Sequence, residues 1–416
     1  MRNNILKAAS KVLLICTFSI ILNSLYTDIC PKAICLQENI SSVDDNLIER
    51  ILRSRSDLFG EILNNPDKYE VQIMYTQIDR DKSDRIKFNT FRYNVDKDKY
   101  FYPASSVKLS ACALALEKLN NLNINKYTPL KIGKERSSQT QVKYDFSSSN
   151  SCPSIANYIK KVLVISDNEG FDRLYEFLGQ EYYNETLWEK GYKDTLILHR
   201  LENVMNDEEN RYTNSFTFYR NKDIIYQQPV DYNSKNYSNN LKTLTKGKGY
   251  YNGKTFIESP KDFSKSNYFS MECLQGIIKA IIFPETIPEG ERFNLKEEDY
   301  KFLRRYMSML PRECDNPKCN FKDSYVKYFM FGDSNGTIPD NIKIYNKSGC
   351  AYGYLIDNAY IIDKTKGIEF MLTSVIYTNS NEIFNDNKYE YNNIGIPFLS
   401  NLGKVIYEYE ANGRNI

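Results

Sequence analysis

The spacing of apolar residues changes twice along the chain, and these changes divide the chain into three stretches. Residues 42–65 carry apolar side chains three and four positions apart, which predicts helix. Two extended runs follow at 71–78 and 86–93, separated by a polar segment, and together they predict a hairpin. The N-terminal stretch is therefore a helix followed by two strands.

Helical patterns dominate from residue 105 to about residue 310. Residues 109–116 are apolar nearly all round, which is typical of a helix enclosed in a core, and the run is too short to span a bilayer. Further helices are predicted at residues 155–165, 168–178, 271–282 and 297–307. A Tyr-, Asn- and Lys-rich segment near 218–265 predicts an insertion at the rim of a cleft.

Strand patterns return towards the C-terminus. They occupy residues 342–347, 352–362 and 368–377, and a final helix is predicted at 397–409. We therefore predict an α/β fold in which an antiparallel sheet is built from both chain ends and flanked by helices. Residues 42–104 and 340–416 form this α/β lobe, residues 105–339 form an inserted, mainly helical lobe, and the cleft lies where the lobes meet.

The composition excludes several classes of function. The chain has 416 residues and a formal net charge of +2, with acids and bases interspersed, so no nucleic-acid partner is predicted. One histidine and the lack of paired C-x-x-C knuckles argue against zinc, and no metal or other cofactor is predicted. No pattern indicates an oligomeric state.

Residues 1–35 have the pattern of an export signal. Arg2, Lys7 and Lys11 precede the apolar run 12–22, which is shorter than a transmembrane helix requires. We therefore predict a secreted or periplasmic protein that meets the membrane only through this segment. Tethering by an uncleaved segment is the alternative.

Six cysteines remain for the mature chain, an even number for an oxidising compartment. Cys314 and Cys319 flank a turn and could close a small loop. A bridge between Cys112 and Cys152 would brace the helix after residue 105. Unpaired thiols packed as small apolar groups are an equal alternative.

A serine and a lysine stand three apart where an extended aromatic run gives way to helix formers. These residues, Ser105 and Lys108, are predicted to lie on one face of the first helical turn. A serine hydroxyl needs a base to take its proton, and a lysine is such a base when burial or a neighbouring cation lowers its pKa. An ordinary N-cap serine with a surface lysine gives the same pattern, so the pair does not decide the function by itself.

Two further motifs follow in the chain. Residues 166–168 read Ser-Asp-Asn at a junction between predicted helices, and residues 347–349 read Lys-Ser-Gly at the end of a predicted strand. S-x-x-K, S-D-N and K-[ST]-G in this order are the signature set of the class A β-lactamases and the penicillin-binding proteins. The chain resembles this superfamily, and the resemblance implies a β-lactamase/transpeptidase-like fold.

The resemblance implies a role for each catalytic residue. Ser105 attacks a carbonyl carbon to give an acyl-enzyme, and Lys108 accepts its proton directly or through a water. Ser166 relays a proton towards the departing nitrogen. Lys347 adds positive charge, which favours an anionic substrate and keeps Lys108 partly neutral.

The same resemblance assigns the substrate-binding groups. The backbone N–H groups of Ser105 and Cys350 bind the oxyanion, and Gly349 leaves room for substrate along the strand. Ser348 hydrogen-bonds a substrate carboxylate, and Asn168 is assigned to substrate binding.

Residues 200–206 match an R-x-E-x-x-x-N pattern that class A β-lactamases carry in a surface loop. The resemblance implies that Glu202 is the general base for deacylation and holds a water with Asn206. Any acidic loop offers a Glu near an Asn, so a solvated loop is the competing interpretation. A Glu202 that points to solvent predicts slow acylation or action on another ester or amide.

Three features depart from the class A pattern. Residues 212–215 lack the aspartate that usually pairs with the loop arginine, here Arg200. The strands after Lys347 offer no arginine for a substrate carboxylate, and the long insertion could cover the cleft. A Ser-His-Asp hydrolase fits less well, because Ser105 lacks a G-x-S-x-G elbow and the one histidine, His199, ends an apolar run typical of a structural residue.

The predicted function is an exported serine β-lactamase-like hydrolase that acts on small β-lactam amides. One alternative is a peptidase, transpeptidase or esterase similar to penicillin-binding proteins, which acts on cell-wall peptides and deacylates slowly. The other is a non-catalytic cell-wall-binding module on the same fold.

Overall fold

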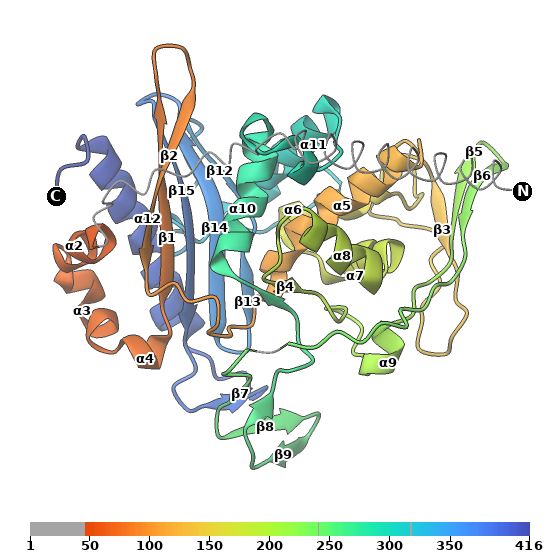
Figure 1. The fold of residues 1–416 in the computed structure, drawn as a ribbon, viewed down its shortest axis with the longest axis horizontal. Coiled ribbons are helices and arrows are strands. Elements are labelled where there is room, and N and C mark those ends of the chain that lie inside the picture. The colour runs from red at the N-terminus through yellow and green to blue at the C-terminus, as the bar shows by residue number, and fades with distance from the viewer. Residues whose placement is uncertain (1–45, 240, 317) are drawn as a thin grey trace, which may run out of the picture. The chain divides into compact units, whose positions relative to one another are not determined.

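The computed structural model describes residues 46–416 except residues 240 and 317, so the predicted export signal at 1–35 lies outside the described residues. Its centre is a six-stranded antiparallel sheet in the order β12-β14-β15-β1-β2, with β13 also paired to β14 (Figure 1). The strands come from both chain ends, as predicted. They are β1 Gln72–Arg80, β2 Ile86–Tyr93, β12 Ile342–Asn346, β13 Gly349–Ala351, β14 Tyr354–Asp363 and β15 Ile368–Tyr377.

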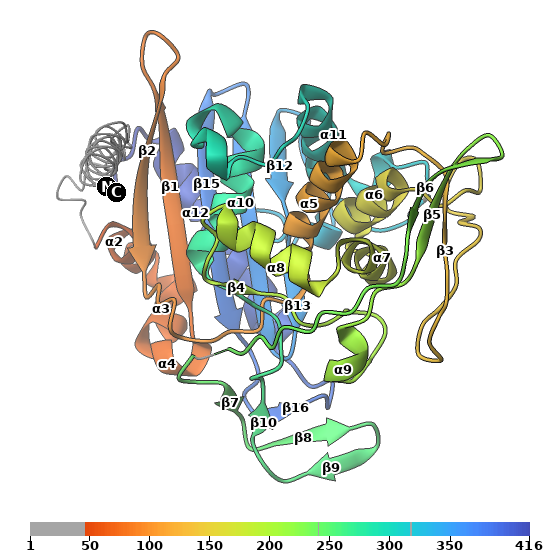
Figure 2. The same ribbon diagram turned by 45° about the vertical axis from the view of Figure 1, so that its right-hand side comes forward.

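Helices cover both faces of this sheet, which explains why β14 and β15 are apolar and buried on both sides (Figures 1 and 2). The helices on one face come from the two ends of the chain and form one apolar core with the sheet. They are α2 Leu47–Arg53, α3 Ser56–Asn64, α4 Pro66–Tyr69 and α12 Ile396–Ala411. Helix α10 (Met271–Ile282) packs on the other face against β1, β14 and β15.

The helical lobe is organised around α5 (Lys108–Asn121), which is buried on nearly all sides as its apolar sequence predicted. The helices in contact with α5 include several that the spacing of apolar residues also predicted. The remaining helices of this lobe are α6 Ile155–Ile165, α7 Asn168–Leu178, α8 Gln180–Glu189, α9 Asp207–Asn210 and α11 Glu297–Ser308.

Short strands within and after this lobe form four small sheets that the apolar pattern did not predict. Their pairs and triplets are β4–β11, β7–β10, β3–β5–β6 and β8–β9–β16. The bounds are β3 Leu130–Ile132, β4 Thr195–Leu196, β5 Phe216–Arg220, β6 Asp223–Gln228, β7 Thr245–Lys246, β8 Gly249–Asn252, β9 Thr255–Ile257, β10 Lys261–Asp262, β11 Tyr268–Phe269 and β16 Ile383–Phe384. The predicted insertion near 218–265 thus contributes β6 to β10 and part of β5, and β16 from the C-terminal stretch pairs with β8 (Figure 2).

The described residues are relevant to two further questions: whether a helix could span a membrane and whether one of the predicted disulfides forms. None of their helices is long and apolar enough to cross a membrane. Cys112 is buried with a free thiol, and the half-buried Cys152 is also free. The structure therefore does not contain the Cys112–Cys152 bridge, and the alternative of packed thiols holds for this pair.

Candidate active site

Ser105 lies in a tight turn rather than on a regular α-helix. A short 3-10 helix, Ala104–Val107, precedes α5. Ala104 has φ 49°, a left-handed conformation that a non-glycine residue rarely adopts, and such strain occurs mainly where the surrounding structure enforces it. Both the backbone N–H and the hydroxyl of Ser106 donate to the Pro103 carbonyl, at 3.1 Å and 2.6 Å. The turn leaves the Ser105 side chain at the wall of a cleft.

Lys108 begins α5 and is fully buried. Its Nζ donates to the carbonyl oxygen of Ser166 and to Oδ1 of Asn168, each at 2.6 Å. Burial lowers the pKa of Lys108 to about 7, although the carboxylates of Asp167 and Asp172 oppose the shift. A neutral amine is therefore available close to neutral pH.

The Ser-Asp-Asn motif forms the junction between α6 and α7. Ser166 ends α6 in the left-handed conformation, with φ 58°. Asp167 then caps α7 as predicted, since its side chain accepts a hydrogen bond of 2.6 Å from the Gly170 N–H. This abrupt turn presents the carbonyl and hydroxyl of Ser166 to the lysines.

Lys347, from the C-terminal part of the chain, also contacts this junction between α6 and α7. Its Nζ donates to Oγ of Ser166 and to the Ser348 carbonyl, each at 2.8 Å. Burial and the neighbouring Lys108 push the pKa of Lys347 well below its ordinary value. The two amines thus lie close enough for each to disfavour the charged form of the other.

Strand β13 lies against the turn that carries Ser105. A Cβ on Gly349 would stand 2.8 Å from the Pro103 carbonyl oxygen and 3.0 Å from the Ser105 nitrogen. The reason for a glycine here is thus contact with the protein's own backbone at the turn that carries Ser105. The assignment of the Cys350 N–H to the oxyanion site stays a prediction.

Gly349→Ala is expected to push β13 away from Ser105 and to destabilise the fold by about 1–3 kcal/mol, because a buried methyl group must be accommodated. The rate of acylation should fall by about 10²–10³-fold, since this corresponds to losing one well-placed oxyanion donor. Urea unfolding and acylation kinetics measure the two effects. Gly290→Ala is the matched control, because nothing lies within 4 Å of its added Cβ.

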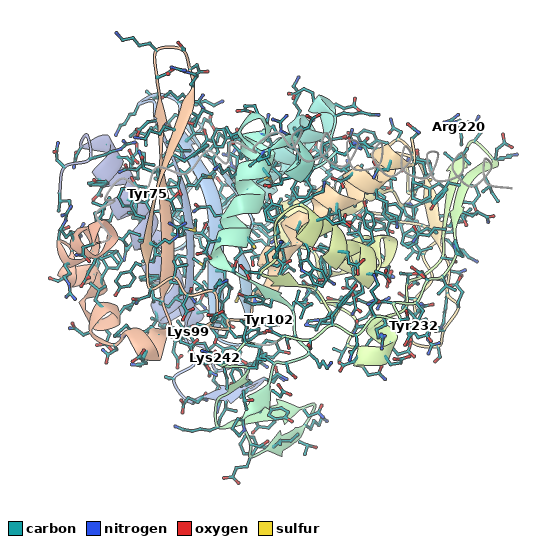
Figure 3. All side chains as sticks on the ribbon, in the orientation of Figure 1. Tyr75, Lys99, Tyr102, Arg220, Tyr232 and Lys242 are labelled. Carbon is teal, nitrogen blue, oxygen red and sulfur yellow. The ribbon has the colours of Figure 1, made fainter. Side chains whose placement is uncertain are left out.

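The cleft at Ser105 has a volume of about 370 Å³. Tyr102, which is labelled in Figure 3, lines this cleft. Its ring packs edge-on against that of Tyr352, with ring centroids 4.8 Å apart. Among the described residues, no charged side chain lines this cleft. The lining residues are Tyr102, Ala104, Ser105, Asn168, Leu201, Cys350, Ala351, Tyr352, Asn385, Asn387, Tyr389 and Tyr391.

Ser348 does not take its predicted position. Its side chain is 2% exposed and is not part of the cleft wall, whereas Cys350 lines the cleft and is exposed. The reason is that the hydroxyl lies close to the buried Tyr328 phenol instead. The predicted contact between Ser348 and a substrate carboxylate is therefore not present in this arrangement.

The predicted water-binding pair Glu202 and Asn206 is not assembled. The Asn206 side chain caps α9 by accepting a hydrogen bond of 2.8 Å from the Glu209 N–H. Glu202 is exposed and lines a neighbouring cavity of about 520 Å³ rather than the cleft of Ser105. The loop thus follows the solvated alternative, because α9 starts directly after it and uses the asparagine as a cap.

Asp172, which none of the three motifs includes, fixes the path of this loop. It is fully buried on α7, and its carboxylate accepts hydrogen bonds from the backbone N–H groups of Leu201 at 2.7 Å and Asn203 at 2.9 Å. A weaker bond of 3.2 Å comes from the Glu202 N–H. Burial raises the pKa of Asp172 to about 6. The only feature of the sequence that pointed to a role for Asp172 was its position one turn after Asn168 on the same helix.

Asp172→Ala is expected to release the loop, because three backbone donors lose their acceptor. The amide protons of Leu201 and Asn203 should then exchange with solvent at least about tenfold faster, which corresponds to losing one hydrogen bond. Hydrogen exchange resolved by mass spectrometry measures this. Unchanged exchange in a folded variant would contradict the assigned role of Asp172.

Arg200 forms an ion pair with a carboxylate that the sequence pattern did not indicate. Its Nε donates to Oε1 of Glu176 at 3.0 Å, and both side chains are at most 1% exposed. A second guanidinium nitrogen donates to the Tyr212 carbonyl at 2.8 Å. Glu176, on α7, therefore replaces the missing loop aspartate.

A buried network fixes the strand that delivers Lys347. Nζ of Lys327 donates to Oδ1 of Asn346 at 2.6 Å, and the Asn346 amide donates to Asp357 at 2.7 Å. Burial lowers the pKa of Lys327 to about 7. This network holds the residue next to Lys347 in place, and the strand pattern alone could not reveal it.

His199 is structural, as predicted. Its Nδ1 bonds the Arg200 carbonyl at 2.6 Å and its Nε2 accepts from the Asn267 N–H at 3.3 Å, so the neutral ring uses both nitrogens on the backbone. Burial also lowers its pKa. Within the described residues, no group of three or more His, Cys, Asp or Glu side chains could hold a metal ion.

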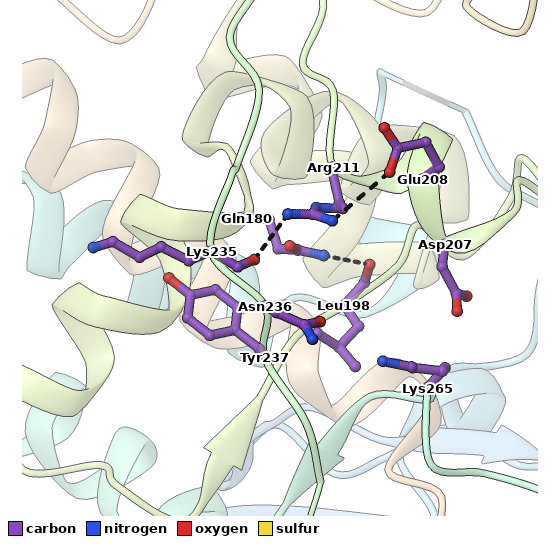
Figure 4. A pocket seen from close by; sticks show the side chains of 9 residues that line it. All are labelled: Gln180, Leu198, Asp207, Glu208, Arg211, Lys235, Asn236, Tyr237 and Lys265. Carbon is purple, nitrogen blue, oxygen red and sulfur yellow. Dashed lines mark hydrogen bonds and ion pairs between the residues drawn. The ribbon is translucent and has the colours of Figure 1, made fainter.

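A separate small pocket of about 150 Å³ lies beside α9 (Figure 4). Arg211 there pairs with Glu208 at 3.7 Å and donates to the Lys235 carbonyl at 3.1 Å, and Lys235 pairs with Glu185. Its main cations are therefore already neutralised. None of the motif residues lines this pocket.

The comparisons with known proteins gave one family match. Residues 57–227 match the model of the β-lactamase enzyme family, a span that includes Ser105, Lys108 and Ser166 but not Lys347. No curated protein matches the chain. The family match and the sheet built from both chain ends confirm the predicted resemblance and fold class.

Several solved β-lactamases have a distantly similar structure. The chromosome-encoded β-lactamase of Vibrio parahaemolyticus is 13% identical, with a TM-score of 0.47 over 85% of this chain and 98% of that chain. A β-lactamase from Sphaerobacter thermophilus is 10% identical, with a TM-score of 0.49 over 88% and 97%. A class A β-lactamase from Mycobacterium abscessus is 11% identical, with a TM-score of 0.46 over 84% and 97%.

Proposed function

We propose that this protein is a serine hydrolase that opens β-lactam amides through an acyl-enzyme on Ser105. The family match supports a β-lactamase-like hydrolase. One observation supports the serine mechanism above all others. The hydrogen bonds from Lys108 to Asn168 and from Lys347 to Ser166 join the three motifs into one network beside the cleft that Ser105 lines.

Acylation uses groups that this network supplies. Oγ of Ser105 forms a bond to the carbonyl carbon, and its proton passes to the neutral amine of Lys108, directly or through a water. The N–H groups of Ser105 and Cys350 stabilise the oxyanion. When the carbon–nitrogen bond breaks, the hydroxyl of Ser166 protonates the departing nitrogen and is reprotonated by Lys347.

The rate of acylation is expected to rise with pH through about 7. Burial lowers the pKa of Lys108 to about 7, so below that value the amine is protonated and cannot accept the serine proton. Each pH unit below this value should lower the rate about tenfold, and the rate should level off above it. Stopped-flow acylation between about pH 5 and pH 9 measures the profile, and a flat profile would contradict a base with this pKa.

A second candidate function is favoured by the loop that carries Glu202. Because Glu202 is exposed and Asn206 caps α9, the expected base for deacylation is not assembled. An acyl-enzyme without such a base persists, as in a peptidase or transpeptidase similar to penicillin-binding proteins. This candidate shares the acylation chemistry and differs only in the second step.

Hydrolysis of a chromogenic cephalosporin, followed together with the intact mass of the protein, tests the proposal. Continuous turnover with a transient adduct supports the β-lactam hydrolase. A single turnover with a persistent adduct supports the second candidate. Neither turnover nor adduct in the folded protein would overturn both and favour the non-catalytic alternative. Export through residues 1–35 remains a prediction from the sequence.

A further inference from the structure

A second cavity, of about 520 Å³, lies beside the Ser105 cleft and contains none of the residues of the three motifs. The two spaces are adjacent, because Asn168 and Leu201 line the cleft while the residues that follow them, Glu169 and Glu202, line the cavity. Most of its wall comes from the loop at residues 140–146. We refer to this space as the loop cavity.

Two aromatic side chains of the loop are exposed at the wall of the loop cavity. Tyr144 is 68% exposed and Phe146 is 85% exposed. Their rings are nearly parallel, at 18° to each other, with centroids 6.2 Å apart. Paired apolar faces that stay in water at the wall of a cavity point to a binding surface.

The residue between the two rings anchors this part of the loop. The carboxylate of Asp145 pairs with Lys161 at 3.2 Å and accepts a hydrogen bond of 2.8 Å from the Asn157 amide. Both side chains of the ion pair are only 9% exposed. Earlier in the loop, Val142 exchanges two backbone hydrogen bonds with Ile132, at 2.9 Å and 3.0 Å. The two rings therefore project from a fixed backbone.

Arg173 lines the loop cavity from α7 and is only 3% exposed. Its Nη1 donates to Oε2 of Glu176 at 2.9 Å, and its Nη2 donates to the Thr140 hydroxyl at 2.6 Å. Its Nε has no hydrogen-bond partner among the described residues. The guanidinium thus ties the loop to α7 and retains one donor that these residues do not use.

The charges in the wall of the loop cavity cancel. Among the described residues, the charged ones in its lining are two cations and two carboxylates: Lys143, Arg173, Glu169 and Glu202. Behind the wall, Glu176 pairs with both Arg173 and Arg200, and Asp145 pairs with Lys161. A ligand with a net charge would meet like and opposite charges in equal number, so the wall favours a neutral ligand.

The uncharged polar groups of the wall can both donate and accept hydrogen bonds. They are the amides of Gln141 and Asn203, the Thr140 hydroxyl and the Tyr144 phenol. A purely apolar ligand would remove these groups from water without replacing their hydrogen bonds. A sugar ring provides hydroxyls for them, and its C–H groups can pack on the negative face of an aromatic ring.

We propose that the loop cavity binds a neutral pyranose sugar. One face of the sugar packs on Phe146 and Tyr144, and its hydroxyls bond the amides of Gln141 and Asn203. A volume of about 520 Å³ lies within the range of about 300–1,000 Å³ that is usual for small organic ligands. This binding is separate from acylation at Ser105 and does not depend on it.

Saturation-transfer difference NMR with cellobiose, a neutral disaccharide, tests the proposal. Irradiation of the protein's aromatic protons should transfer saturation to the C–H protons of the sugar. Phe146→Ala should weaken binding about three- to tenfold, the effect of losing one aromatic contact, and Phe146→Trp should restore it. The Phe146→Ala variant should fold normally, because its side chain is exposed.

Phe321→Ala is the matched control. Phe321 is also exposed and belongs to a stacked pair, with its ring centroid 4.0 Å from that of Tyr325, but it does not line the loop cavity. This variant should bind cellobiose as the wild-type protein does.

The absence of saturation transfer to cellobiose, or equal binding by the wild-type protein and Phe146→Ala, would overturn the proposal. Binding of acetyl-phenylalanine amide without binding of cellobiose would assign the cavity to an aromatic peptide instead and would also overturn it. Cellobiose has no acyl group to transfer, so either result is independent of whether a β-lactam acylates Ser105.

Discussion

Ser105→Ala is expected to abolish the covalent adduct and to lower turnover by about 10⁶-fold, the scale seen when a catalytic serine nucleophile is removed. The reason is that Ser105 lines the cleft beside the network of Lys108, Ser166 and Lys347 and is the proposed nucleophile. Intact-mass measurements and β-lactam hydrolysis provide the two readouts. Thermal unfolding should change little, because Ser105 is only half-buried and no hydrogen bond of its hydroxyl needs replacing.

Ser106→Ala is the matched control for this variant. Its hydroxyl is 3% exposed and donates to the Pro103 carbonyl, so its loss costs about 1 kcal/mol of stability and leaves the adduct in place. Equal adduct formation by Ser105→Ala and wild-type protein would remove Ser105 from the proposed chemistry.

Lys108→Met is expected to lower the rate of acylation by about 10²–10⁴-fold, the typical contribution of a general base. Methionine has a similar length and avoids a buried charge, but it cannot accept the serine proton. The pH profile with a pKa of about 7 should disappear together with the rate. Stopped-flow acylation measures both effects.

Lys118→Met separates this effect from a general effect on the fold. Lys118 lies on the same helix, burial lowers its pKa to about 8, and its Nζ donates to the Phe177 carbonyl away from the cleft. The variant should be destabilised and yet keep the acylation rate and its pH profile. An equal loss of rate in both variants would show that Lys108 acts only through packing.

The periodic elements could be predicted from the sequence because tertiary packing agrees with their apolar pattern. Helices α6, α7 and α10 begin and end where the period of three and four places them. The turn at Ala104 could not be predicted, because its left-handed backbone is imposed by β13 packing against it. Local propensity contains no information about that contact.

The candidate site could be predicted only in part. Lys108, Ser166 and Lys347 converge as the order of motifs indicated. The placement of Glu202 and Asn206 was wrong because a short helix uses the asparagine as its cap, and a carboxylate on another helix, Asp172, sets the path of the loop. Both causes are contacts that the R-x-E-x-x-x-N pattern does not encode.

The role of the insertion could not be predicted from the sequence pattern either. Its composition indicated only a segment at the rim of a cleft. The structure pairs β8 of this insertion with β16, which follows it by more than a hundred residues in the chain. A parallel pairing of two strands this short leaves no periodic signal, so the wall formed by Asn385 and Asn387 could be recognised only in the folded protein.

Peptide mapping after exposure to a penicillin is the most direct test of acylation at Ser105. We expect a single added acyl group, located by tandem mass spectrometry on Ser105 and absent from the Ser105→Ala variant. An adduct on any other residue, or no adduct on a folded wild-type protein at a pH above about 7, would contradict it.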